Sequence, residues 1–192
     1  LARQVMTIFC DETWKHKTVS TLRQFRPGML SWNYWAADGH VMAASADGRQ
    51  RGQFLSNAIC PSNGADIKGP TANSNSVGKV LGGKTREATG DFREFINDLP
   101  NGASHTITFN PSILKDPTHK DKFKSFLKGY NENGGTALQI NMLDPAVLVD
   151  AQKNPGDHRH LLVRITGYNA YFTSIGKELR DEVIKRISHG NF

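Results

Sequence analysis

Apolar side chains in the second half of the chain alternate between two spacings, one typical of helices and one typical of strands. Runs at helical spacing extend from Phe92 to Leu99, from Phe123 to Tyr130 and from Ile175 to Ile187. Thr106–Phe109 and Leu138–Met142 instead alternate apolar with polar residues, and the latter predicts a strand with one polar face. The order of these elements predicts an α/β fold with a parallel sheet or the wall of a barrel.

Turn and cap residues mark where the elements that follow these strands begin and end. Asp144–Pro145 predicts the N-cap and first turn of a helix that ends near Asn154–Pro155. Leu161–Ile165 is a nearly continuous apolar run, which predicts a short buried strand before the final helix. That helix has two pairs of opposite charge, four residues apart in the favourable order: Asp181 with Lys185, and Glu182 with Arg186.

The first half of the chain has weaker periodicity. Its first forty residues contain all three tryptophans and a turn signal at Phe25–Gly28. From Asp47 to Gly90 the chain is rich in Gly, Ser, Asn and Ala, but apolar residues recur too regularly for a flexible linker. We expect ordered loops here around one short helix, with Pro70 near its first turn.

Length and composition indicate one soluble globular unit of 192 residues with a formal net charge of +6. No apolar run reaches the roughly 18 to 20 residues that cross a bilayer, so we expect no membrane span. The start, Leu1–Gln4, does not resemble a signal peptide, and we expect a chain that begins within a longer protein. Basic residues are densest in Lys115–Lys128, where a solvated helix face explains them better than a nucleic-acid surface, because no recognition motif accompanies them.

The cysteines and histidines form no obvious ligand set. Cys10 and Cys60 are too few for a disulfide framework and lack zinc-binding spacing, so a reducing cytoplasm fits best. His158 and His160 stand two residues apart with no evident third ligand, which favours solvated histidines over a metal site. We therefore expect no metal site in this chain.

The most informative segment is the nonapeptide Arg-Ile-Thr-Gly-Tyr-Asn-Ala-Tyr-Phe at Arg164–Phe172. It resembles the radical-site signature of glycyl radical enzymes, usually Arg-Val-x-Gly-Tyr-Ser/Thr-Ala-x-Phe. Ala46–Arg49, followed by Ala58–Ala72 and Ser76–Val80, resembles the family's long segment from a Pro-Asp-Gly-Arg turn to a Gly-Pro-Thr-Ala helix start. Phe25–Gly28 is similar to a short block upstream. The blocks occur in the family's order and spacing over most of the chain.

Gly167 is the position that the resemblance assigns to the radical. A carbon-centred backbone radical is stabilised when its orbital is conjugated with the flanking amides, and a Cβ would crowd that flat geometry. Apolar residues on either side are expected to shield the loop from oxygen and water: Leu161–Val163 before it, and Tyr171, Phe172 and Ile175 after it. Taken alone, a glycine is better explained by a turn that needs a positive φ, and it is the family blocks around Gly167 that favour the radical site. Arg164 is either a cation that anchors this loop or a surface cation at a strand edge.

The resemblance implies a ten-stranded α/β barrel in which the glycine loop reaches a second loop that bears a cysteine. In the family, that cysteine becomes a thiyl radical that attacks the substrate, and it lies some hundreds of residues before the glycine. Residues 1–192 are therefore expected to be the C-terminal region of a larger catalytic subunit, with the radical loop and final helix at about 160–190. Neither Cys10 nor Cys60 takes the thiyl role, because a small buried filler explains each better.

Two stretches, Asn57–Gly64 and Tyr168–Leu179, resemble the fumarate-adding branch of the family, with Asn169 where dehydratases and lyases commonly have Ser or Thr. That branch includes benzylsuccinate and alkylsuccinate synthases, which add a toluene-like or alkane hydrocarbon to fumarate during anaerobic hydrocarbon degradation. This implies an enzyme that makes a substituted succinate, inactive as a fragment. The alternatives are another glycyl radical lyase, dehydratase or decarboxylase, a stand-alone subunit that repairs a cleaved partner, or a binding domain without chemistry.

The resemblance also implies partners. An activating enzyme that uses S-adenosylmethionine and an iron–sulfur cluster would install the radical, while this chain itself holds a protein-based radical and no dissociable cofactor. The rest of the catalytic subunit, small accessory subunits and a second copy are further expected partners. We expect no nucleic-acid or membrane partner, and a cytoplasmic protein of an anaerobic organism.

Overall fold

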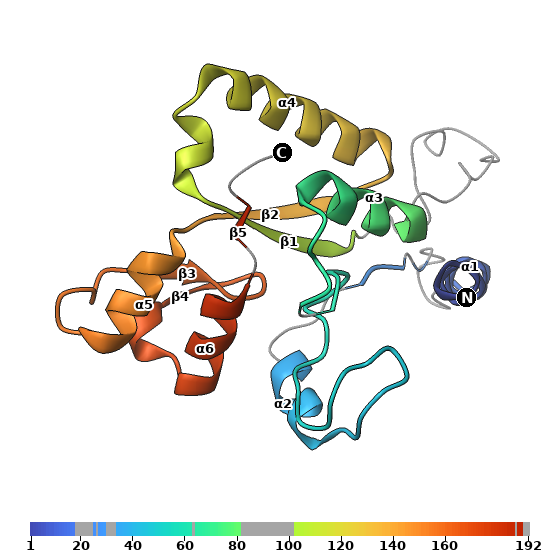
Figure 1. Ribbon diagram of the computed structural model, residues 1–192. Helices are drawn as coiled ribbons and strands as arrows, with labels where there is room; N and C mark the ends of the chain where they lie inside the picture. The colour runs from blue at the N-terminus through green and yellow to red at the C-terminus, as the bar shows by residue number, and fades with distance from the viewer. Residues whose placement is uncertain are drawn as a thin grey trace.

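The computed structural model describes residues 1–17, 25, 27–29, 34–62, 64–81, 102–186 and 188–189 (Figure 1). The expected helix at Phe92–Leu99 lies outside the described residues, as do Ile187 of the final helical stripe and Arg26 and Asn63 of the motif blocks. The described chain forms a small parallel sheet, a hairpin packed on two helices, and three helices from the first half of the sequence.

A parallel sheet lies at the centre of the molecule. Its strands β1 (Ser104–Phe109), β2 (Ala137–Met142) and β5 (Ser188–His189) have the order β2-β1-β5, and β1 pairs in parallel with both neighbours. Between β1 and β2 the chain crosses over through η1 (Pro111–Leu114) and α4 (Pro117–Glu132), which runs along one side of the sheet in Figure 1. The predicted strands, the helix between them and their parallel pairing are confirmed.

The apolar stripe of α4 covers one face of this sheet. Asp116 caps the helix by accepting a hydrogen bond from the Thr118 backbone N–H at 2.7 Å. The buried residues of this core are Ile107, Phe109, Ile113 and Phe126. All five lysines of the basic stretch lie on the exposed surface, as expected for a solvated helix face: Lys115, Lys120, Lys122, Lys124 and Lys128.

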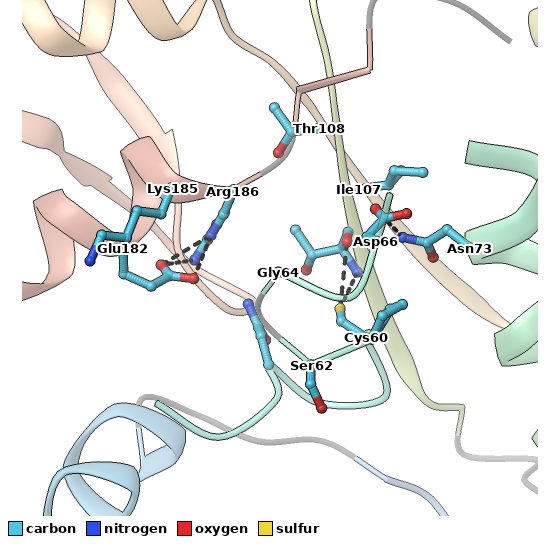
Figure 2. A pocket seen from close by; sticks show the side chains of 13 residues that line it. Cys60, Ser62, Gly64, Asp66, Asn73, Ile107, Thr108, Glu182, Lys185 and Arg186 are labelled. Atoms are coloured by element: carbon cyan, nitrogen blue, oxygen red, sulfur yellow. Dashed lines mark hydrogen bonds and ion pairs between the residues drawn. The ribbon is translucent and has the colours of Figure 1, made fainter. Parts of the chain in front are cut away.

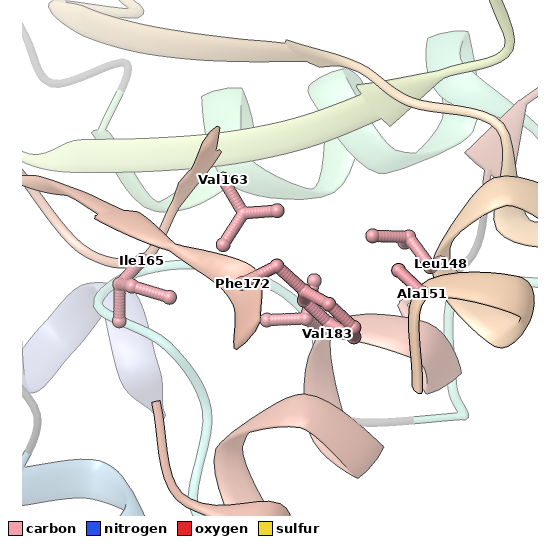
Figure 3. Packing of buried hydrophobic residues seen from close by; sticks show 6 residues of the cluster. All are labelled: Leu148, Ala151, Val163, Ile165, Phe172 and Val183. Atoms are coloured by element: carbon pink, nitrogen blue, oxygen red, sulfur yellow. The ribbon is translucent and has the colours of Figure 1, made fainter. Parts of the chain in front are cut away.

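A second unit contains an antiparallel hairpin of β3 (Leu162–Arg164) and β4 (Asn169–Tyr171). It packs with α5 (Pro145–Lys153), η2 (Phe172–Ser174) and α6 (Lys177–Lys185). The Asp144 side chain caps α5 as predicted, accepting from the Ala146 N–H at 2.9 Å. Figure 3 shows the core that joins hairpin and helices: Leu148, Ala151, Val163, Ile165, Phe172 and Val183.

The prediction of a fully buried strand at Leu161–Ile165 is wrong in part. Val163 and Ile165 point into the core, whereas Leu162 is 50% exposed. The reason is the alternation of side chains between the two faces of the hairpin: Val163 and Ile165 share the face that packs on the core, and Leu162 points to the other face.

The first half of the chain contributes α1 (Ala2–Lys15), α2 (Tyr34–Val41) and α3 (Pro70–Leu81). The predicted helix with Pro70 in its first turn is confirmed as α3, whereas α1 and α2 were not predicted. Met6 and Cys10 of α1 pack against Val77 of α3. No helix in the described part of the chain is long and apolar enough to cross a membrane.

Candidate functional site

Gly167 occupies the tip of the β3–β4 hairpin. The last paired residues are Arg164 and Asn169, and the Ile165 N–H donates to the Tyr168 carbonyl oxygen at 3.0 Å. Gly167 itself has φ = 79°, in the left-handed region that residues with a Cβ enter at a cost of roughly 1–2 kcal/mol. The backbone conformation of this turn is therefore enough to explain why a glycine stands at position 167.

The sheet contacts Gly167 through β2. The Gly167 N–H donates to Gln139 Oε1 at 3.2 Å, and the same oxygen accepts from Thr106 Oγ1 at 3.3 Å. Thr106 and Gln139 are paired residues of β1 and β2, so their side chains stand on one face of the sheet. The polar face predicted for the second strand thus faces the glycine hairpin.

The expected apolar shield around Gly167 is incomplete within the described residues. Val163 and Phe172 are buried, but they belong to the core beneath the hairpin. Leu162 and Tyr171 are both about half exposed, and Gly167 is exposed as well. Protection of this glycine from water would need chain beyond the described residues.

A buried ion pair at the end of α6 holds the strand before the glycine. Arg186 donates to the carbonyl oxygens of Arg164 at 2.8 Å and Ile165 at 3.3 Å. It also pairs with Glu182 at 2.9 Å, and the two side chains are only 10% and 3% exposed. A third anchor is Asn57, whose Nδ2 donates to the Ile165 carbonyl at 3.3 Å.

Arg186 is therefore the cation that anchors the glycine loop in this structure. Arg164 instead donates to Asn169 Oδ1 across the hairpin at 3.3 Å. Sequence reasoning did not assign Arg186 to the site, although its i,i+4 pairing with Glu182 was predicted and is confirmed. The predicted pair of Asp181 with Lys185 is wrong, because Asp181 pairs with Lys177 instead, at 2.5 Å.

A small cavity of about 60 Å³ lies between this ion pair and the loop that precedes α3 (Figure 2). Glu182, Lys185 and Arg186 line one side of the cavity, and Asp66 and Asn73 line the other.

The Cys60 thiol lies at the same cavity and bonds to the backbone of β1. Its Sγ accepts from the Thr106 N–H at 3.2 Å and lies 3.5 Å from the Thr106 carbonyl oxygen. Burial raises the pKa of Cys60 to about 11, which keeps the thiol protonated and unreactive at neutral pH. These contacts agree with a structural role for Cys60.

A chain of buried polar side chains continues from the cavity. Asp66 Oδ2 accepts from Asn73 Nδ2 at 2.6 Å and pairs with His189 Nε2 at 2.9 Å, while Asn73 Oδ1 lies 2.6 Å from His105 Nε2. Burial opposes ionisation of Asp66, but the hydrogen bonds from His189 and Asn73 hold the pKa of Asp66 below its ordinary value. Burial lowers the pKa of His105 to about 4, so its ring is neutral at pH 7.

Sequence reasoning missed this polar chain, since its four residues come from distant segments and no motif marks them. His158 lies apart from it and pairs with Asp150 at 2.7 Å at the surface. Among the residues that the structure describes, no group of three or more His, Cys, Asp or Glu is placed to hold a metal ion.

Comparison with known proteins assigns the class. The profile of the Glycine radical family matches residues 55–173. The chain is 31% identical over 186 residues to trans-4-hydroxy-L-proline dehydratase of Clostridioides difficile, covering 97% of this chain and 22% of that protein. It is 33% identical over 153 residues to isethionate sulfite-lyase of Desulfovibrio desulfuricans, covering 79% of this chain and 17% of that protein.

A solved structure agrees with these matches. The glycerol-bound glycerol dehydratase of Clostridium butyricum aligns with a TM-score of 0.80 at 33% identity, over 99% of this chain and 22% of that chain. The chain therefore belongs to the Glycine radical family, and its α/β fold is that of part of a glycyl radical enzyme barrel. It spans about a fifth of the length of these relatives, which are dehydratases and a lyase and give no specific support to fumarate addition.

Proposed function

We propose that this chain is the radical-bearing C-terminal region of a glycyl radical enzyme subunit, with Gly167 as the residue that stores the radical. One observation carries the proposal. Gly167 stands exposed at the tip of a hairpin whose base is fixed by a buried core, inside the segment that matches the family profile. This arrangement presents one glycine α-carbon to a partner while the surrounding backbone stays in place.

The chemistry proposed for Gly167 is the loss of one hydrogen atom from its α-carbon. The unpaired electron that remains is shared with the flanking amide nitrogen and carbonyl, and no Cβ opposes the flat geometry. An activating enzyme that uses S-adenosylmethionine and an iron–sulfur cluster would supply the acceptor for this hydrogen atom.

The thiyl cysteine would come from chain outside residues 1–192. Cys10 of α1 is fully buried against α3, and Cys60 is bonded to the β1 backbone with a pKa raised by burial to about 11. The printed sequence therefore offers no cysteine suited to the thiyl role. The rest of the subunit also supplies the substrate pocket and the shield that Gly167 lacks here.

For the reaction, we propose elimination from a small polar substrate, in the manner of a dehydratase or lyase. The support is the identity of 31–33% to a dehydratase and a sulfite-lyase. Fumarate addition is a second candidate, favoured only by Asn169 and the stretch around Cys60 in the sequence.

Product analysis separates the two reactions. The full-length protein is activated anaerobically and supplied separately with a vicinal diol, a hydroxyproline, a hydroxysulfonate, and toluene with fumarate. Elimination predicts loss of water or sulfite from one of the first three substrates. A benzylsuccinate product would instead establish fumarate addition and overturn the elimination proposal.

A further inference from the structure

The contact between Gly167 and the central sheet runs through one side chain. Gln139 Oε1 lies 3.2 Å from the Gly167 nitrogen and holds that N–H from the middle of β2. The anchors at Asn57 and Arg186 act two or three residues earlier in the loop, on the carbonyls of Arg164 and Ile165. Among the residues that the structure describes, Gln139 is thus the side chain that bonds the backbone of Gly167 itself.

The position of Gln139 is in turn well defined. It faces Thr106 in the β1–β2 ladder, and the Thr106 hydroxyl donates to the same Oε1 atom at 3.3 Å. With both donors in place, the carboxamide oxygen is directed at the hairpin. The nearest atom to a Cβ built on Gly167 is Gln139 Nε2 at 4.0 Å, so the carboxamide lies against the glycine without crowding it.

We propose that Gln139 is a positioning residue for the radical at Gly167, an inference that rests on the function proposed above. The amide nitrogen of Gly167 shares the spin of an α-carbon radical, and its N–H bond lies in the peptide plane. An acceptor on that N–H fixes the plane over which the spin is shared. Gln139 therefore sets the orientation of the amide on the N-terminal side of the radical.

The test uses the full-length protein, activated anaerobically by its activating enzyme with S-adenosylmethionine. Gln139→Leu removes the acceptor with little change of volume, and Gln139→Glu restores an acceptor oxygen at the same distance from the backbone. Gln152→Leu is the matched control, because Gln152 makes its own side-chain bond to Asp181 at 2.6 Å between α5 and α6. Electron–nuclear double resonance measures the coupling of the unpaired electron to the exchangeable amide proton of residue 167.

We expect Gln139→Leu to change the amide-proton coupling and to lower radical occupancy by about two- to tenfold, the range for loss of one hydrogen bond. Gln139→Glu should recover most of the occupancy, and Gln152→Leu should match the wild type in both readouts. A folded Gln139→Leu variant with unchanged coupling and occupancy would overturn the inference while leaving Gly167 as the radical site. A wild-type protein that gives no radical would overturn the proposed function and this inference with it.

Discussion

Gly167 is constrained twice, by its backbone conformation and by the chemistry proposed for it. Its φ of 79° makes any side chain costly, whereas space is not the obstacle, because a Cβ would meet only Gln139 Nε2 at 4.0 Å. A positive φ therefore does not distinguish a turn glycine from a radical glycine. To tell the two apart, a control is needed: a second glycine that also has a positive φ but has no proposed part in the chemistry.

Gly48 provides that control, with φ = 96° and nothing within 4 Å of an added Cβ. Gly167→Ala and Gly48→Ala should each lower stability by roughly 1–2 kcal/mol, since each places a Cβ in the left-handed region. Only Gly167→Ala should lose the radical signal. Urea unfolding and electron paramagnetic resonance of the activated full-length variants check both parts. A normal signal in Gly167→Ala would remove this residue from the radical site.

Some of the residues around the glycine loop can be predicted from the sequence, and others cannot. The family blocks together predict Gly167 as the radical site, and a small buried filler is the sequence prediction for Cys60. The anchoring roles of Asn57, Gln139 and Arg186 could not be predicted, because each acts on the loop from a separate element, across 21 to 108 positions of the sequence. No local sequence pattern indicates contacts between residues so far apart in the chain.

The helix α6 fixes the glycine hairpin through its last turn, and this predicts a strong effect of Arg186. Arg186→Met would remove the bonds to the Arg164 and Ile165 carbonyls and leave Glu182, 3% exposed, without its partner. Breaking a buried pair on one side costs about 3–5 kcal/mol. We expect a loss of that order in urea unfolding, together with reduced radical yield.

Two further variants test this explanation. The double substitution Glu182→Met with Arg186→Met should recover part of the lost stability, since no buried charge then remains unpaired. Lys177→Met breaks the exposed pair with Asp181 on the same helix and should change little. An Arg186→Met variant as stable as Lys177→Met would contradict the anchoring role.

The polar chain that joins β1, α3 and β5 predicts a dependence of stability on pH. His105 is neutral in the folded protein down to about pH 4, whereas the unfolded chain takes up a proton near pH 6.5. Between these values the unfolded state binds more protons, so stability falls as the pH is lowered. His105 contributes up to about 3 kcal/mol to this loss. Asp66, with its lowered pKa, acts in the same direction at lower pH.

His105→Gln checks the assignment, because glutamine can still donate to Asn73 Oδ1 but does not titrate. Urea midpoints measured from pH 7 to pH 4.5 should fall less steeply in His105→Gln than in the wild type. His40→Gln, at an exposed histidine, should keep the wild-type slope. Equal slopes in all three proteins would show that His105 does not control the acid sensitivity.

At the scale of elements, the second half of the chain was largely predictable and the first half was not. Strands β1 and β2 and helix α4 follow from clear periodicity, and helix α5 follows from its Asp144–Pro145 cap. Helix α1 was missed because Val5, Ile8 and Phe9 are exposed opposite its buried face, which blurs the helical pattern. The sequence predicts one strand and a loop where the structure has the β3–β4 hairpin, because three-residue strands are too short to show alternation of apolar and polar residues.

Across the whole molecule, apolar surface remains exposed in the described residues. Leu1 is 94% exposed, Val5 and Ile8 on α1 are about 60% exposed, and Leu162 and Tyr171 on the hairpin are half exposed. Such surface favours association when it is not covered by other parts of a protein. We expect residues 1–192, expressed alone, to self-associate in size-exclusion chromatography with light scattering. A monodisperse monomer that unfolds cooperatively would count against the proposal that these residues belong to a larger barrel.

The central claim is that Gly167 carries the radical, and one measurement addresses it directly. The full-length protein is activated without oxygen and recorded by electron paramagnetic resonance, then exposed to air and analysed by mass spectrometry. A single hydrogen left on the α-carbon predicts a doublet, and reaction of that carbon with oxygen predicts backbone cleavage at Gly167. No signal after activation, or a signal followed by cleavage at a different glycine, would contradict the account and leave Gly167 as a turn residue.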